Sequence, residues 1–193
     1  GITIDEKRIV SSTGALSLDK CPKKLLVIGA GYIGLELGTV WARLGAEVEV
    51  IEFLPRILPG MDDEIAKKFL AIAKKQGVSF RLSTAVKAAK TSKTGVSLTV
   101  EPAAGGAAET VTADIALVSV GRHPATDGLG LEAAGISLTE RGRIAVDSRF
   151  ETSLDDVFAI GDVIDGPMLA HKAEEDAVAA VEMMAGQPGH MDY

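Results

Sequence analysis

Six residues near the start of the chain form a glycine-rich run. Positions 29–34 read GAGYIG and fit the pattern G-x-G-x-x-G. In this pattern the first glycine allows a tight turn, the second lets a pyrophosphate approach the backbone, and the third lets a helix pack closely on a sheet. A helix N-terminus adds unpaired N–H groups and a positive dipole, which favour phosphate. The run therefore predicts a dinucleotide-binding turn; the alternative is that its glycines serve only close helix–sheet packing.

A carboxylate follows at the spacing that such a turn requires. Glu52 lies eighteen residues after Gly34, close to the roughly 20 expected for an acid that binds the adenosine ribose hydroxyls. Because a carboxylate repels a 2′-phosphate, we expect NAD to be preferred to NADP. The nearby Arg56 is a single cation and does not reverse this preference.

Other candidate residues carry weaker signals. Residues 159–162 read AIGD, so Asp162 ends a predicted strand and either holds a ribose or ribityl hydroxyl or caps a turn. Gly121 ends another predicted strand at the same edge of the sheet. Glu36 falls inside an apolar helical stretch, where it is either exposed to solvent or held by a partner. His171 opens the last helical region and, as a lone histidine, is typical of a surface or capping residue.

Composition narrows the possible functions. The chain has 193 residues, 47% of them hydrophobic and 24% charged, enough for one domain or for one domain and part of another. A net charge of −7 disfavours nucleic-acid binding. The longest uncharged apolar stretch, residues 25–35, is shorter than the ~20 residues of a membrane span, so no membrane partner is expected. One cysteine and three scattered histidines predict neither a redox pair nor a metal site, and Cys21 is expected to be a half-buried, inert thiol.

The elements that position these residues alternate between strand and helix. The continuous apolar run at 25–28 predicts a buried parallel strand, followed by a helix to Leu44 and a strand at 47–52, which is a βαβ unit. A second helix is expected from Asp62 or Asp63 to Gln76, and a third strand at 78–82. The expected core-facing residues of the two helices are Leu37, Val40, Trp41 and Leu44, and then Ile65, Phe69, Ile72 and Ala73.

The pattern changes after residue 82. Short strands at 86–89, 96–100 and 109–112 predict an antiparallel meander, inserted before a buried strand at 115–120. Residues 1–23 are expected to be irregular. Beyond residue 122 we expect a short helix at 129–134, strands at 144–146 and 157–160, and a final helix at 169–184. The fold class is therefore α/β, a Rossmann-like parallel sheet with an inserted meander, organised as a lead-in segment (1–23), an NAD-binding domain (24–122) and an incomplete second domain (123–193).

Five runs of sequence resemble one family. They are IVSSTGALSL (9–18), VIGAGYIGLELGTVWARLGAEV (27–48), VIEFLPRILPGMD (50–62), SVGRHP (119–124) and FAIGDVIDGPMLAHKAEEDAVAAVE (158–182). Over essentially its whole length the chain resembles the dihydrolipoamide dehydrogenase family of flavoprotein disulfide reductases. The resemblance implies an NAD domain inserted into an FAD domain, followed by a C-terminal dimerisation domain.

The resemblance also implies roles for particular residues. In this family the glycine run cradles the NAD pyrophosphate, the matching Glu52 binds the adenosine ribose, Val86 lies against the adenine and Gly121 approaches the nicotinamide half. Glu36 matches a catalytic glutamate that pairs with a lysine near the flavin ring. Asp162, with the segment that follows it, matches a second FAD-contacting region. The implied cofactor contacts are Gly29, Ala30, Gly31, Tyr32, Ile33, Gly34, Leu35, Glu36, Glu52, Val86, Gly121, Asp162, Met168, Leu169, Ala170 and His171.

Several parts of the family pattern are missing from these 193 residues. The redox cysteine pair, the first FAD phosphate loop and the catalytic histidine with its acidic partner are absent, and the chain begins with Gly1 rather than Met. We therefore expect an internal fragment that binds NAD but neither retains FAD nor turns over. The intact protein would oxidise dihydrolipoamide through a disulfide and FAD to reduce NAD⁺, as a homodimer within 2-oxo acid dehydrogenase complexes, in the mitochondrial matrix or a bacterial cytoplasm. The alternatives are another FAD-dependent disulfide reductase, of the mercuric or glutathione type, and a non-catalytic dinucleotide-binding module.

Overall fold

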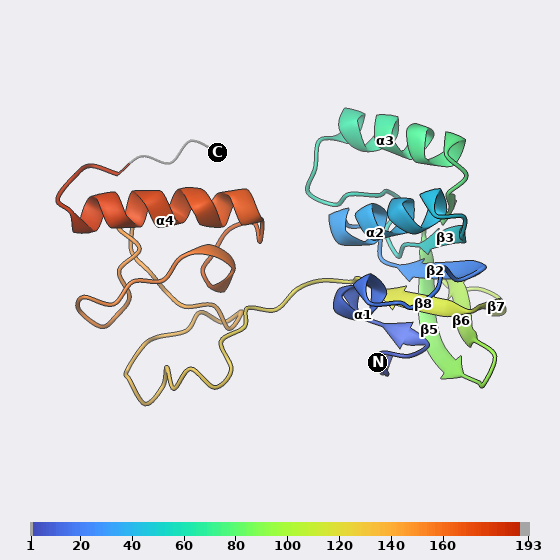
Figure 1. The fold of residues 1–193 in the computed structure, drawn as a ribbon, viewed down its shortest axis with the longest axis horizontal. Coiled ribbons are helices and arrows are strands. Elements are labelled where there is room, and N and C mark those ends of the chain that lie inside the picture. The colour runs from blue at the N-terminus through green and yellow to red at the C-terminus, as the bar shows by residue number, and fades with distance from the viewer. Residues whose placement is uncertain (1, 190–193) are drawn as a thin grey trace. The chain divides into compact units, whose positions relative to one another are not determined.

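The computed structural model of the chain describes residues 2–189. They form two compact units, Gly1–Gly121 and Arg122–Tyr193, drawn in blue to yellow and in yellow to red in Figure 1. The units adjoin in sequence one residue before the expected boundary after residue 122. Each unit is described by itself.

The first unit is built on a five-stranded parallel sheet. Its strands are β1 (Ile9–Val10), β2 (Lys24–Ile28), β3 (Glu47–Ile51), β4 (Ser79–Arg81) and β8 (Ile115–Val118), in the order β1-β8-β2-β3-β4. From β2 the chain continues to β3 on one side, while β8 pairs with β2 on the other. The carboxyl ends of β2 and β8 therefore form a topological switch point, the place where open α/β sheets bind ligands.

Two further layers cover this sheet (Figure 1). Helices α1 (Ser12–Leu16), α2 (Tyr32–Arg43) and α3 (Asp63–Lys75) cover one face, and the antiparallel sheet of β5 (Thr84–Thr91), β6 (Val96–Pro102) and β7 (Glu109–Ala113) covers the other. Side chains alternate between the two interfaces: Leu25 and Val27 pack under the helices, and Leu26 and Ile28 pack against the antiparallel sheet. The predicted α/β class, with its inserted meander, is confirmed.

The expectation that the lead-in segment is irregular was wrong in part, because residues 2–23 contain a strand and a short helix. Ile9 and Val10 form β1, which pairs with β8 at the edge of the parallel sheet. The serine-rich run that follows begins α1, because Ser11 is its N-cap and its Oγ accepts from the N–H of Gly14. The predicted half-buried position of Cys21 was also wrong, since this thiol is exposed.

The helices of the first unit bury fewer large side chains than expected. The expected core-facing side of α3 was wrong at Ile65 and Ile72, which are about half exposed, and is confirmed at Ala73, which is buried together with Ala66. The expected stripe of α2 was wrong at Val40 and Leu44, which are exposed; α2 buries Leu35 and Trp41 together with Gly34 and Gly38. In α2 a small residue faces the sheet, since an added Cβ at Gly38 would lie 3.5 Å from the side chains of Val27 and Val48.

The second unit has little regular structure beyond one helix. It contains a 3-10 turn, η1 (Gly161–Val163), and helix α4 (Ala170–Met184), which confirms the final predicted helix. The strands expected at 144–146 and 157–160 were wrong: only the single bridges Leu138↔Ile144 and Glu151↔Phe158 form there. The helix expected at 129–134 is a series of turns. A small core gathers Ile144, Phe150, Ala159, Ile164, Ala179 and Ala180.

Candidate functional site

The glycine run occupies the turn from β2 into α2, at the switch point of the parallel sheet. Gly29 has φ +101°, and an added Cβ there would lie 2.5 Å from the carbonyl oxygen of Ser119. A Cβ at Gly34 would lie 2.3 Å from the carbonyl oxygen of Gly29. Both distances are shorter than real Cβ contacts allow, so the fold of the protein itself requires these two glycines.

Gly31 differs from the other two glycines. Its φ of −74° and ψ of 175° are open to any residue, and an added Cβ would meet no atom within 4 Å. Gly31 is the N-cap of α2 and provides no side-chain cap. Within the described chain, neither the backbone geometry nor the packing accounts for a glycine here. A missing side chain at an uncapped helix N-terminus leaves a cradle in which an anionic group can approach the backbone.

Glu52 follows β3 directly and its carboxylate faces the glycine turn. One oxygen, Oε2, accepts from the N–H of Ala30 at 2.7 Å, and Oε1 accepts from the N–H of Leu54 at 2.8 Å. The residue is only 8% exposed. Glu52 is therefore in direct hydrogen-bond contact with the glycine turn and helps to hold it in place.

The loop after Glu52 closes against the same turn. The N–H of Leu58 donates to the carbonyl of Ala30 at 2.8 Å. Arg56 lies in this loop, where its guanidinium pairs with Asp63 and donates to the carbonyl of Met61 at 2.6 Å. Because Arg56 is engaged in holding the loop, it is poorly placed to counter the charge of Glu52.

The remaining residues expected in the first unit lie in different environments. Tyr32 and Glu36 are exposed on α2, whereas Leu35 is buried in the core beneath the helices. Ile33 is half-buried on the same helix. Val86, on β5, packs at the margin of the core between the two sheets. Gly121 is exposed after β8, with φ +145°.

In the second unit, the predicted Asp162 lies in the η1 turn. Its Oδ2 accepts from the Arg122 guanidinium at 3.0 Å, and both side chains are partly exposed. The segment after it reaches α4, for which Leu169 is the N-cap without a side-chain cap. Ala170 and His171 are the exposed first residues of that helix, while Met168 and Leu169 are half-buried.

Sequence reasoning missed an ion pair beneath this turn. Lys172 and Asp176 are both buried on α4, and Asp176 Oδ2 also accepts from the N–H of Gly161 at 2.9 Å. Lys172, Asp176, Ala179 and Ala180 follow the spacing of a single helix face. Opposite charges four residues apart on a face otherwise formed by alanine were the signal that could have revealed it.

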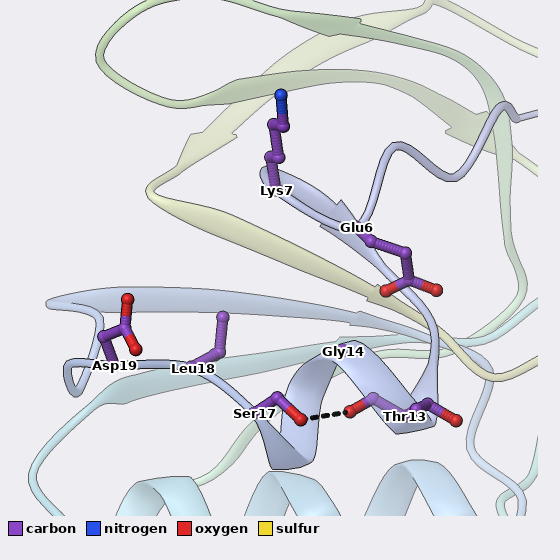
Figure 2. Close-up of a pocket in the computed structure, with 7 residues that line it drawn as sticks. All are labelled: Glu6, Lys7, Thr13, Gly14, Ser17, Leu18 and Asp19. Carbon is purple, nitrogen blue, oxygen red and sulfur yellow. Dashed lines mark hydrogen bonds between the residues drawn. The ribbon is translucent and has the colours of Figure 1, made fainter.

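A cavity in the first unit lies apart from the glycine turn. A cavity of about 510 Å³ lies beside α1 and is lined by Glu6, Lys7, Thr13, Gly14, Ser17, Leu18 and Asp19. Figure 2 shows these residues with the Ser17 hydroxyl donating to the carbonyl of Thr13; none of them belongs to the glycine turn. No three His, Cys, Asp or Glu side chains gather as a metal site would require in residues 2–189. Nor does any helix in that range combine the length and apolar character needed to cross a bilayer.

Comparisons with known proteins agree on one family. The family model described as pyridine nucleotide-disulphide oxidoreductase matches residues 2–177. A mitochondrial dihydrolipoyl dehydrogenase of Pisum sativum is 59% identical over the whole chain, and a leghemoglobin reductase of Glycine max is 58% identical. The chain spans 38% and 37% of the lengths of these relatives. The crystal structure of LpdA from Mycobacterium tuberculosis superposes with a TM-score of 0.86 at 27% identity, covering 98% of this chain and 40% of that one.

Proposed function

The chain belongs to the pyridine nucleotide-disulphide oxidoreductase family, and we propose that its first unit is the NAD-binding portion of a dihydrolipoyl dehydrogenase. The observation that carries the proposal is Gly31. The fold itself requires Gly29 and Gly34, because an added Cβ at either would clash. At Gly31 a side chain would meet nothing, so a bound pyrophosphate is the physical reason for the glycine. This argues against the alternative that the run serves helix–sheet packing alone.

Each part of the dinucleotide has a matching group in the first unit. The pyrophosphate would lie at the uncapped N-terminus of α2, where N–H groups and the helix dipole favour negative charge. The adenosine ribose would donate its hydroxyls to Glu52, whose fixed carboxylate repels a 2′-phosphate. Val86 and Gly121 are proposed contacts of the adenine and of the nicotinamide half. When bound, NAD⁺ supplies the hydride acceptor.

The second unit is proposed as part of an FAD-binding domain. Asp162 would accept from a hydroxyl of the flavin side chain, with Met168, Leu169, Ala170 and His171 forming the adjoining contact segment. The partly exposed carboxylate of Asp162 can accept from a hydroxyl, and the uncapped N-terminus of α4 favours a phosphate; both observations support this assignment. Glu36 is proposed as the catalytic glutamate that pairs with a lysine near the flavin ring, where the nicotinamide arrives, and its exposure on α2 is compatible with that role.

The activity of the whole protein is also proposed from its relatives. An intact protein would oxidise dihydrolipoamide through a disulfide and FAD and reduce NAD⁺, as a homodimer within 2-oxo acid dehydrogenase complexes. The mitochondrial relative of Pisum sativum supports the mitochondrial matrix as its location, with a bacterial cytoplasm as the alternative. The 193-residue chain alone is expected to show no flavin absorbance and no dihydrolipoamide-dependent NADH formation.

The test is NAD binding by the chain, measured by calorimetry, with Gly31→Ala as the variant. We expect Gly31→Ala to fold like the parent chain and to lose at least about tenfold in NAD affinity, or 1.4 kcal/mol. Gly38→Ala is the matched control on the same helix, because its Cβ would lie at an ordinary 3.5 Å from Val27 and Val48. Absence of NAD binding by the parent chain, or equal binding by Gly31→Ala, would contradict the proposal.

A further inference from the structure

Ser119 lies directly after β8, and its hydroxyl reaches the end of β2 across the switch point. Oγ lies 3.0 Å from the carbonyl oxygen of Ile28 and 3.3 Å from that of Gly29, so its single proton is shared between two acceptors. The backbone N–H of Ser119 also donates to Ile28, at 2.9 Å. Ser119 thus binds the start of the glycine turn through both its side chain and its backbone.

The peptide between Gly29 and Ala30 is held at both of its polar atoms. Its carbonyl accepts from Ser119 Oγ, and its N–H donates to Glu52 Oε2 at 2.7 Å. A peptide unit is planar, so the direction of its C=O also sets the direction of its N–H. The hydroxyl of Ser119 therefore contributes to the orientation of the N–H that binds the Glu52 carboxylate.

The surrounding glycines fit closely around Ser119. A Cβ at Gly34 would lie 2.5 Å from Ser119 Oγ, and a Cβ at Gly29 would lie 2.5 Å from the Ser119 carbonyl oxygen. Two glycines of the run therefore leave the space that Ser119 occupies. The glycine pattern accommodates this contact from β8 in addition to any ligand.

We propose that Ser119 is a positioning residue for recognition of the adenosine ribose. It acts through the Gly29–Ala30 peptide and Glu52 and does not itself touch the dinucleotide. The inference rests on the proposed NAD binding and deepens it, since it names a determinant of the preference for a free ribose 2′-hydroxyl over a 2′-phosphate. A fixed Glu52 accepts from the ribose and repels the 2′-phosphate, and a loosened Glu52 does both less well.

The experiment compares NAD and NADP affinities of the 193-residue chain and its Ser119→Ala variant by calorimetry. We expect NAD affinity to fall roughly threefold to tenfold, the effect of one hydrogen bond, and NADP affinity to fall less, so that their ratio decreases. The matched control is Ser79→Ala, because Ser79 Oγ donates to the carbonyl of Val48 at 3.1 Å on the same sheet but contacts no part of the turn. Ser79→Ala should leave the ratio unchanged.

The outcomes separate this inference from the proposed function. If the parent chain binds no NAD, the proposed function fails and the inference fails with it. If the parent chain prefers NAD but Ser119→Ala keeps the parental ratio, or loses both affinities equally, only the role of Ser119 is overturned. If Ser119→Ala does not fold, Ser119→Cys keeps the side-chain size with a weaker donor and should lower the same ratio. In a Glu52→Gln background the Ser119 substitution should change the ratio no further.

Discussion

Lys172 and Asp176 lie one turn apart on α4 and form an ion pair enclosed in the second unit. Nζ of Lys172 is 2.5 Å from Oδ2 of Asp176, and the two side chains are 5% and 0% exposed. Both also bind Gly161: the ammonium lies 3.4 Å from its carbonyl oxygen, and the carboxylate accepts from its N–H. Since Gly161 adopts φ +71° immediately before Asp162, the pair holds the turn that presents the candidate FAD-contacting carboxylate.

Replacing the lysine of this pair should destabilise the second unit strongly. In Lys172→Met the apolar stem remains, but the buried carboxylate of Asp176 loses the ammonium of Lys172. Removing one partner of a buried pair typically costs about 3–5 kcal/mol. Urea unfolding measures the loss, and hydrogen exchange at the Gly161 amide should accelerate.

The chain offers a matched control for that change. Glu64 and Lys68 form a pair of the same helical spacing on α3, with side chains 73% and 68% exposed. Lys68→Met should therefore cost only about 0.3–0.5 kcal/mol. If the two lysine substitutions cost the same, burial of the Lys172–Asp176 pair contributes nothing to stability.

Glu52→Gln should change cofactor preference and stability together. The amide retains one acceptor oxygen but directs N–H donors at the position of the other, where the N–H of Ala30 or Leu54 already points. We expect the preference for NAD over NADP to disappear in calorimetry and the free energy of unfolding to fall by about 1–3 kcal/mol. A variant that loses the preference at unchanged stability would show that the backbone contacts of Glu52 are not stabilising.

A network at the edge of the parallel sheet predicts unequal effects of two substitutions. Arg81 on β4 pairs with the buried Glu49 of β3 and with the exposed Glu109 of β7, and the hydrogen bond to Glu49 raises the pKa of Arg81. Arg81→Ala leaves Glu49 with only the 3.4 Å pair to Lys24 and should cost about 1–3 kcal/mol in urea unfolding. Glu109→Ala removes the exposed half and should cost at most about 1 kcal/mol. Equal costs would contradict this ranking.

Asp5 predicts a defined pH dependence of stability. The N–H of Arg8, followed by those of Ile9 and Lys7, donates to its carboxylate and lowers the pKa of Asp5. A lowered pKa in the folded state means that the carboxylate stabilises the fold above its unfolded pKa of about 3.9, and that this contribution is lost as the pH falls through the folded value. Asp5→Ala should therefore be less stable than the parent at pH 7, with the difference shrinking below about pH 4. A difference independent of pH would refute this.

The sequence predicted the elements that carry strong local signals. The strand at 25–28 is apolar throughout because both of its faces are buried, and the glycine run and Glu52 follow their strands at the expected spacing. Strand β1 escaped prediction because its two residues, Ile9 and Val10, are too short to show a period. In the second unit, the apolar segments 144–146 and 157–160 were predicted as strands because their composition suits a sheet. Each segment pairs with its neighbour at a single bridge only. Composition alone does not show how many residues of a segment will pair.

Two features of the first unit depend on contacts that no local pattern encodes. Ser119 reaches Gly29 across 90 positions of sequence, and only the parallel pairing of β8 with β2 brings them together. The core-facing side of α3 was misassigned at Ile65 and Ile72, because large residues dominate a hydrophobic pattern, and was predicted correctly at Phe69 and Ala73. Ala66, a small residue that the pattern did not single out, is buried on this helix.

The double attachment of Glu52 constrains how cofactor preference can evolve or be engineered. One carboxylate supplies two acceptors that close the turn and the single charge that is proposed to select the ribose. A substitution that admits a 2′-phosphate therefore also removes support from the Gly29–Ala30 peptide and from the loop at Leu54. Substitutions that stabilise the turn independently should therefore come before a substitution that changes the preference for NAD over NADP. The order of mutations then determines whether the intermediate sequences remain folded.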